Sequence, residues 1–157
     1  MTAVEAPVGV SRLLVPGAIA TAMLAALAGL ELLGLPTFAI PFVATATILA
    51  TAPGSPLART RTVVLAYGLS LVVALAIVDT WGSSTAAAVV AAGLAVLVTA
   101  VARVSHPPAA AGAAMVGLQG TEWVFLLGGV LPALAALLAV AVVAGVLVRS
   151  YPYRLHW

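Results

Sequence analysis

The sequence predicts an all-α integral membrane protein, and three observations support that class. Of the 157 residues, 64% are hydrophobic and 6% are charged, whereas a soluble domain carries about 25% charged residues. Lipid must therefore surround the chain, and its backbone must be paired within helices or a closed barrel. The alternating pattern of barrel strands is absent, and long runs of Ala, Leu and Val occur instead.

Six apolar segments can be read along the chain. They cover residues 13–35, 37–52, 62–78, 86–102, 109–118 and 123–148. The first exceeds the roughly 7 to 15 apolar residues of a signal peptide, so it is interpreted as a true span. The second and fifth are short against the roughly 20 residues that a span needs, which leaves four long segments and two short ones. We expect a single transmembrane domain over residues 13–148, with cytoplasmic tails at 1–12 and 149–157.

The positive charges predict the topology. If all six segments cross, every arginine falls on one side, while Asp79 and Glu122 fall on the other. Cytoplasmic loops carry the excess of Lys and Arg, so both termini are expected in the cytoplasm. If the short segments instead entered and left on one face, Arg59 and Arg61 would move outside. The arginines are Arg12, Arg59, Arg61, Arg103, Arg149 and Arg154.

Six crossings divide into two sets of three with opposite orientation, which is the pattern of an inverted repeat. The short middle segments read "PFVATATIL" from Pro41 and "PAAAGAAMV" from Pro108. Both open on proline and continue in small residues. A chance match in Ala-rich sequence is the alternative.

Other features at the segment ends have structural explanations. Pro132, which follows two glycines, predicts a kink in the last segment. Aromatic residues at segment ends are typical of an interfacial belt. They are Trp81, Trp123, Tyr151, Tyr153 and Trp157.

Two short stretches, "SPLA" from Ser55 and "SHPP" from Ser105, are typical of helix starts, because proline fits the first helical turn. A helix N-terminus carries unpaired N–H groups and partial positive charge, so it can bind an anion. Arg103 and His106 would make the second start more cationic, and an ordinary histidine gains charge below about pH 6.5. The alternatives are a plain helix start and an interfacial arginine.

The remaining chemistry is sparse. No nucleophile, acid and base can be assembled, and no metal-ligand or phosphate-loop spacing occurs. The absence of cysteine excludes disulfides and thiolate sites. Six cations in a membrane chain do not indicate nucleic acid binding. We therefore expect no enzymatic activity, no cofactor and no nucleic acid partner.

Two motifs resemble those of the HPP family of small integral membrane proteins. "HPPAAAGAAMVGLQG" is similar to the family's His-Pro-Pro-Ala-Gly-Ala stretch, and "PGSPLARTR" is similar to its Pro-x-Ser-Pro-Leu-Ala element. The similarity runs from about Pro36 to the end of the last segment. Some members have been linked to nitrite transport, so the resemblance implies a transport protein and suggests nitrite as its cargo.

Three places differ from the family pattern. Ala110 stands where glycine is usual, residues 44–46 read "ATA" where Gly-Ala-Ser is common, and Thr60 replaces a proline before Arg61.

The leading hypothesis is a channel or transporter for a small monovalent anion, nitrite being favoured, in a bacterial-type inner or plasma membrane. The alternative is a non-transporting assembly or sensor module, and an intramembrane enzyme is a distant third. A homo-oligomer is expected, because six short helices enclose little space. The predicted anion site contains Arg103, Ser105, His106, Pro107 and Pro108, and a second inner element contains Ser55, Pro56, Arg59 and Arg61.

Overall fold

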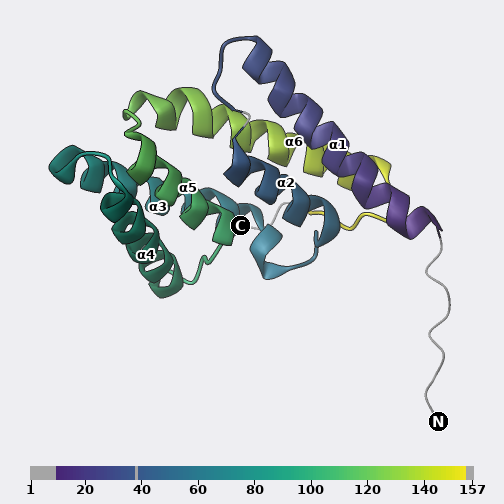
Figure 1. The fold of residues 1–157 in the computed structure, drawn as a ribbon. Coiled ribbons are helices and arrows are strands. Elements are labelled where there is room, and N and C mark those ends of the chain that lie inside the picture. Colours follow the sequence, from purple (N-terminus) through teal and green to yellow (C-terminus); the bar gives the residue numbers. More distant parts are fainter. Residues whose placement is uncertain (1–9, 38, 155–157) are drawn as a thin grey trace.

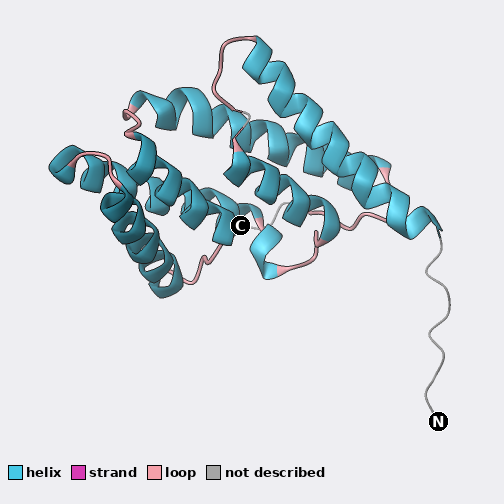
Figure 2. Ribbon diagram, in the orientation of Figure 1, coloured by secondary structure: helices cyan, strands magenta, loops and turns pink. Residues whose placement is uncertain are grey.

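The computed structural model describes residues 10–37 and 39–154, and the side chains from Leu14 onward within these ranges. This part of the chain is entirely helical, with no strand (Figures 1 and 2). The predicted all-α class is therefore confirmed. The helices are α1 (Val10–Leu32), α2 (Ile40–Thr51), α3 (Thr60–Trp81), α4 (Thr85–Val101), α5 (Pro107–Gln119) and α6 (Leu131–Leu147), with short turns η1 (Pro56–Ala58) and η2 (Leu126–Val130).

Helix length divides these elements into two groups. The spans Leu14–Leu32, Thr60–Trp81 and Leu126–Leu147 are long and apolar enough to cross a membrane. The predicted short segments are indeed short, since α2 has 12 residues and α5 has 13. The prediction of four long segments was wrong for α4, which has 17 residues. Its N-cap Ser84 accepts a hydrogen bond from Ala87 N–H at 3.0 Å, which fixes where α4 begins.

The connections between helices gather at two ends of the bundle. One end, called here the arginine end, contains residues 52–59, 102–106 and 148–154. Contacts join them: His106 lies against Leu57, and Tyr153 lies against Thr60. The opposite, acidic end contains residues 33–39, 82–84 and 120–125, where the Trp123 indole N–H donates to Asp79 at 2.6 Å. Successive helices therefore run in alternate directions.

Small residues allow the helices to approach closely. The buried face of α4 consists of Ala87, Ala91 and Ala95 together with Thr99. On α5, a Cβ atom at Gly117 would lie 2.6 Å from the Cα atom of Ala88. Only glycine at this position allows the observed contact between α4 and α5.

The predicted kink near Pro132 takes the form of a π-helical turn. The turn η2 covers Leu126–Val130 and passes directly into α6, with Pro132 in the first turn of α6. A Cβ atom at Gly129 would lie 3.0 Å from the Pro36 carbonyl oxygen, so the widened turn packs against the connection between α1 and α2. Such π turns are local irregularities inside otherwise regular helices.

Two tyrosines predicted for the interfacial belt are instead buried. Tyr151 and Tyr153 are 2% and 4% exposed. Tyr151 donates its hydroxyl hydrogen to the Leu49 carbonyl oxygen at 2.7 Å, and the Tyr153 hydroxyl lies 3.1 Å from that of Thr60. The segment after α6 therefore folds back over the ends of α2 and α3. Trp81 and Trp123 are exposed, as an interfacial position requires, while Trp157 lies outside the described residues.

A buried polar cluster at the start of α5

His106 is the N-cap residue of α5 and lies inside the bundle, 2% exposed. Its Nδ1 atom is 3.0 Å from the Leu57 carbonyl oxygen in η1, and its Nε2 atom is 3.0 Å from the Thr45 hydroxyl in α2. A carbonyl oxygen can only accept, so Nδ1 carries a hydrogen. His106 thus connects the His-Pro-Pro motif to the Ser-Pro-Leu-Ala motif and to α2.

Thr45 and Tyr67 complete this cluster, and neither is exposed. Their hydroxyl oxygens are 2.9 Å apart, and Tyr67 also donates to the Pro41 carbonyl oxygen at 2.9 Å. The Tyr67 ring lies 5.8 Å from the His106 ring, between centroids. Neither residue was among the predicted site residues, although a tyrosine in the middle of an apolar segment was the available signal.

The start of α5 differs in one respect from the predicted anion-binding helix start. Pro107 and Pro108 have no backbone N–H, and the Ala109 N–H donates to the His106 carbonyl oxygen at 2.9 Å. The first turn therefore offers an anion the partial charge of the helix end but no unpaired N–H from these residues. The N-cap is His106 rather than Ser105, and its side chain makes no capping bond. Ser105 itself is exposed.

Arg103 has a backbone conformation that is unusual for a residue with a side chain. Its φ angle is 56°, and within the described residues it is the one non-glycine position with positive φ. Its N–H bonds to the Ala100 carbonyl at 3.0 Å, and the Val104 N–H bonds to the Thr99 carbonyl at 2.9 Å. This pair of bonds is the Schellman motif that closes a helix, in which glycine is usual at the Arg103 position. The exposed guanidinium thus follows the negative end of the α4 dipole.

The second motif is only partly assembled as predicted. Pro56 begins the three-residue turn η1 rather than a longer helix, and the Ser55 side chain makes no capping bond. The Ser55 Oγ atom is buried and has no hydrogen-bond partner. Arg59 and Arg61 are exposed at the start of α3, where the helix dipole disfavours cations. Helix stability therefore does not account for their position.

Burial changes the acid–base behaviour of His106, which lies in the connection between α4 and α5, outside the helices. Loss of hydration lowers its pKa from the ordinary 6.5 to about 4, and the Leu57 carbonyl opposes this shift only in part. The ring is therefore neutral near pH 7, and Nε2 carries no hydrogen and can accept a hydrogen bond. An ordinary titration near pH 6.5, as the sequence suggested, does not apply to this residue.

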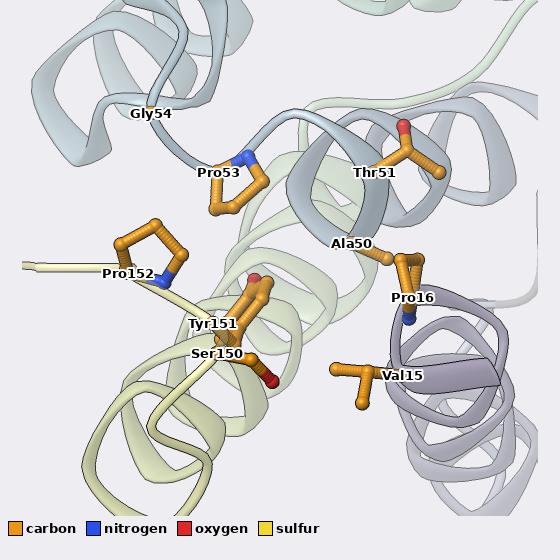
Figure 3. Close-up of a pocket in the computed structure, with 9 residues that line it drawn as sticks. All are labelled: Val15, Pro16, Ala50, Thr51, Pro53, Gly54, Ser150, Tyr151 and Pro152. Carbon is orange, nitrogen blue, oxygen red and sulfur yellow. The ribbon is translucent and has the colours of Figure 1, made fainter. Parts of the chain in front are cut away.

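A cavity of about 530 Å³ opens at the arginine end (Figure 3). Val15 and Pro16 of α1 face Ser150 and Tyr151 across it. None of the predicted site residues lines this cavity. The cavity and the His106 cluster thus have no residue in common.

The helical bundle, with its apolar exterior and a few buried polar groups, defines a small all-α integral membrane protein. The chain belongs to the HPP family, because the family model for the HPP transmembrane region matches residues 5–152. No curated protein and no solved structure matched the chain. The family resemblance expected from the two motifs is confirmed.

Proposed function

We propose that this protein is a membrane channel or transporter for a small monovalent anion, with nitrite as the favoured cargo. The observation that carries the proposal is His106. Among the described residues, it is the buried side chain that can become cationic. Ionisable groups facing the interior of a membrane bundle commonly mark ion pathways. Nitrite is favoured by the family resemblance rather than by the geometry of the cluster.

The arginines support a route from the arginine end. Arg59, Arg61 and Arg103 are exposed there, close in sequence to Leu57 and His106, which contact each other. Their charges would attract an anion toward the connections at which η1 and α5 begin. Ser105 and Ser55 add hydroxyl groups beside these connections. Pro107 and Pro108 shape the start of α5 without donating a hydrogen bond.

The contact pattern supports an inverted repeat with six crossings. Suppose that α1, α2 and α3 are exchanged with α4, α5 and α6 in that order. Each pair of α-helices with extensive contact then becomes another such pair. The pair α1 and α2 corresponds to α4 and α5, α1 and α6 to α4 and α3, and α2 and α6 to α5 and α3. The pair α2 and α5 corresponds to itself, so a pseudo-twofold axis of such a repeat would pass between them. Repeat interfaces of this kind are where transporters bind their cargo.

We further propose that the arginine end faces the cytoplasm of a bacterial-type inner or plasma membrane, and that the protein forms a homo-oligomer. No cofactor, nucleic acid partner or enzymatic activity belongs to this proposal. A second candidate function is a non-transporting assembly or sensor module. The observation that favours it is that both ring nitrogens of His106 already have partners within the protein.

Anion flux into proteoliposomes separates these functions. Purified protein is reconstituted, and uptake of nitrite, nitrate, formate and chloride is measured against protein-free vesicles, which report passive leakage of nitrous acid. Transport predicts saturable nitrite flux that His106→Ala removes. If folded protein gives no flux above protein-free vesicles, the transport proposal is wrong and the module remains.

A further inference from the structure

The Thr45 hydroxyl has more partners than it has hydrogens. Its oxygen lies 3.0 Å from the Pro41 carbonyl oxygen, 2.9 Å from the Tyr67 hydroxyl and 3.0 Å from the His106 Nε2 atom. It can donate to only one of these at a time, and its oxygen can accept from another. Thr45 can therefore form alternative hydrogen-bond arrangements at fixed heavy-atom positions.

In the neutral state the arrangement follows from the carbonyl groups. The Leu57 carbonyl requires a hydrogen on Nδ1 of His106, which leaves Nε2 as an acceptor. Thr45 then donates to Nε2, and Tyr67 donates to the Pro41 carbonyl. Every hydroxyl and ring nitrogen in the cluster is satisfied.

In the protonated state the same atoms remain satisfied. A hydronium ion gives its proton to Nε2 and leaves as water, and the new Nε2–H donates to the Thr45 oxygen. The Thr45 hydrogen turns from Nε2 to the Pro41 carbonyl, which has a second lone pair beside the Tyr67 bond. The cluster can thus accept one proton by rotating one hydroxyl group.

The charge of the protonated ring has no counterion within the described structure. From α2 the ring meets Thr45, from η1 the Leu57 carbonyl, and from α3 Tyr67, which is neutral near pH 7. In the connection before α5, Arg103 is a cation and is exposed. An anion that reaches the ring would therefore supply the missing negative charge and stabilise the proton on Nε2.

We propose that His106 and Thr45 form a proton site that couples transport, so that one proton crosses with each monovalent anion. This inference rests on the proposed anion transport. The Thr45 hydroxyl is the positioning group, because it is the partner of Nε2 in both protonation states. Proton and anion together carry no net charge. The proton therefore balances the charge of the anion as it moves inward, where the fixed cations at the surface cannot follow.

The first test observes the ring directly. The chain has two histidines, so His156→Gln leaves His106 as the single imidazole for ¹⁵N NMR in lipid nanodiscs. We expect hydrogen on Nδ1 at neutral pH, protonation of Nε2 in acid, and a protonation midpoint that rises when sodium nitrite is added. A ring that stays neutral throughout acid titration, or whose midpoint ignores nitrite, overturns the proton site.

Thr45→Val tests the positioning role with an isosteric change. The valine neither donates to neutral Nε2 nor accepts from protonated Nε2, and the charged form loses more. The midpoint should fall by about 0.5 to 1 pH unit, and Thr45→Ser should restore it. Thr47→Val is the matched control on α2, since the exposed Thr47 hydroxyl bonds only to the Val43 carbonyl. Equal midpoints in Thr45→Val and Thr47→Val overturn the role of Thr45.

The second test measures coupling in proteoliposomes that contain a pH-sensitive dye and a potassium diffusion potential set by valinomycin. Coupled transport predicts internal acidification in step with nitrite uptake, both above the level in protein-free vesicles, at a rate that the imposed potential does not change. Nitrite uptake that follows the potential without acidification overturns the inference but leaves anion transport intact. Absence of nitrite flux altogether overturns both, which distinguishes the two failures.

Discussion

Tyr151 donates its hydroxyl hydrogen to the carbonyl oxygen of Leu49 at 2.7 Å, across 102 positions of sequence. The Leu49 carbonyl is available because Pro53, four residues later, has no N–H to continue the helix. The segment after α6 therefore supplies the partner that α2 lacks at its end.

Tyr151→Phe should destabilise the protein without changing its fold. The substitution leaves the Leu49 carbonyl buried and unpaired, which costs about 1 to 3 kcal/mol. Thermal unfolding in detergent should show a lower midpoint for Tyr151→Phe. The control variant Trp81→Phe, at an exposed aromatic position, should keep the midpoint of the unchanged protein. An unchanged midpoint in Tyr151→Phe would mean that water reaches the carbonyl.

Arg103→Gly should stabilise the protein. Glycine adopts the left-handed conformation of this position without the steric cost of a side chain, a gain of about 1 kcal/mol. Under the transport proposal, the same variant should lose apparent anion affinity, and more so at low salt than at high salt. Arg103→Asn separates the effects, since asparagine tolerates this conformation but is uncharged. A less stable Arg103→Gly would show that the guanidinium holds the structure.

Acid should weaken the folded state through His106. The unfolded ring takes up a proton near pH 6.5, whereas the folded pKa is lowered to about 4 by burial. The stability linked to the neutral ring is therefore present above pH 6.5 and is lost as the pH falls toward 4. Unfolding midpoints measured across this range in a His156→Gln background should decline less steeply once His106→Gln is added. Parallel declines would place the acid sensitivity elsewhere.

Gly117→Ala should disrupt the contact between α4 and α5. Its new Cβ atom would meet the backbone of Ala88 at 2.6 Å, and such overpacking costs about 1 to 3 kcal/mol. Gly93→Ala is the matched control, because no atom lies within 4 Å of its added Cβ. That variant should be neutral or more stable by up to about 1 kcal/mol. Similar midpoints for the two variants would contradict the close packing.

Single cysteines test the proposed topology, since the chain has none of its own. Gly54→Cys and Ser105→Cys should react with an impermeant maleimide from the cytoplasmic face, and Ser83→Cys and Gln119→Cys from the opposite face. All four positions are exposed, so access does not limit labelling. Labelling of Gly54→Cys and Ser83→Cys from one face would refute six crossings.

The helical class and the approximate positions of the segments followed from the sequence because lipid imposes a strong constraint on hydrophobic runs. Segment ends were less predictable. Hydropathy extends through Leu33 and Leu35, but the chain leaves α1 at Leu32 and turns back, so that Thr37 bonds to the Leu27 carbonyl at 2.8 Å. That bond depends on how the connection folds back onto α1, which hydropathy does not contain.

The candidate site was predicted in part. His106 stood out because a histidine before two prolines is unusual in an apolar chain. Thr45 and Tyr67 did not, because small and aromatic residues in a membrane helix normally serve packing. Their contacts with His106 join residues separated by 61 positions of sequence in one case, and only the folded chain brings them together. The burial of Tyr151 was missed for the same reason.

The unequal helix lengths have a consequence for the surrounding lipid. At 1.5 Å per residue, α3 with its 22 residues is about 33 Å long, and α4 with 17 is about 25 Å. Each presents exposed apolar side chains on its outer surface. A bilayer that matches α3 is therefore about 8 Å too thick for α4. Either the bilayer thins locally beside α4 or α3 tilts. The protein is thus sensitive to membrane thickness on one flank more than on the other.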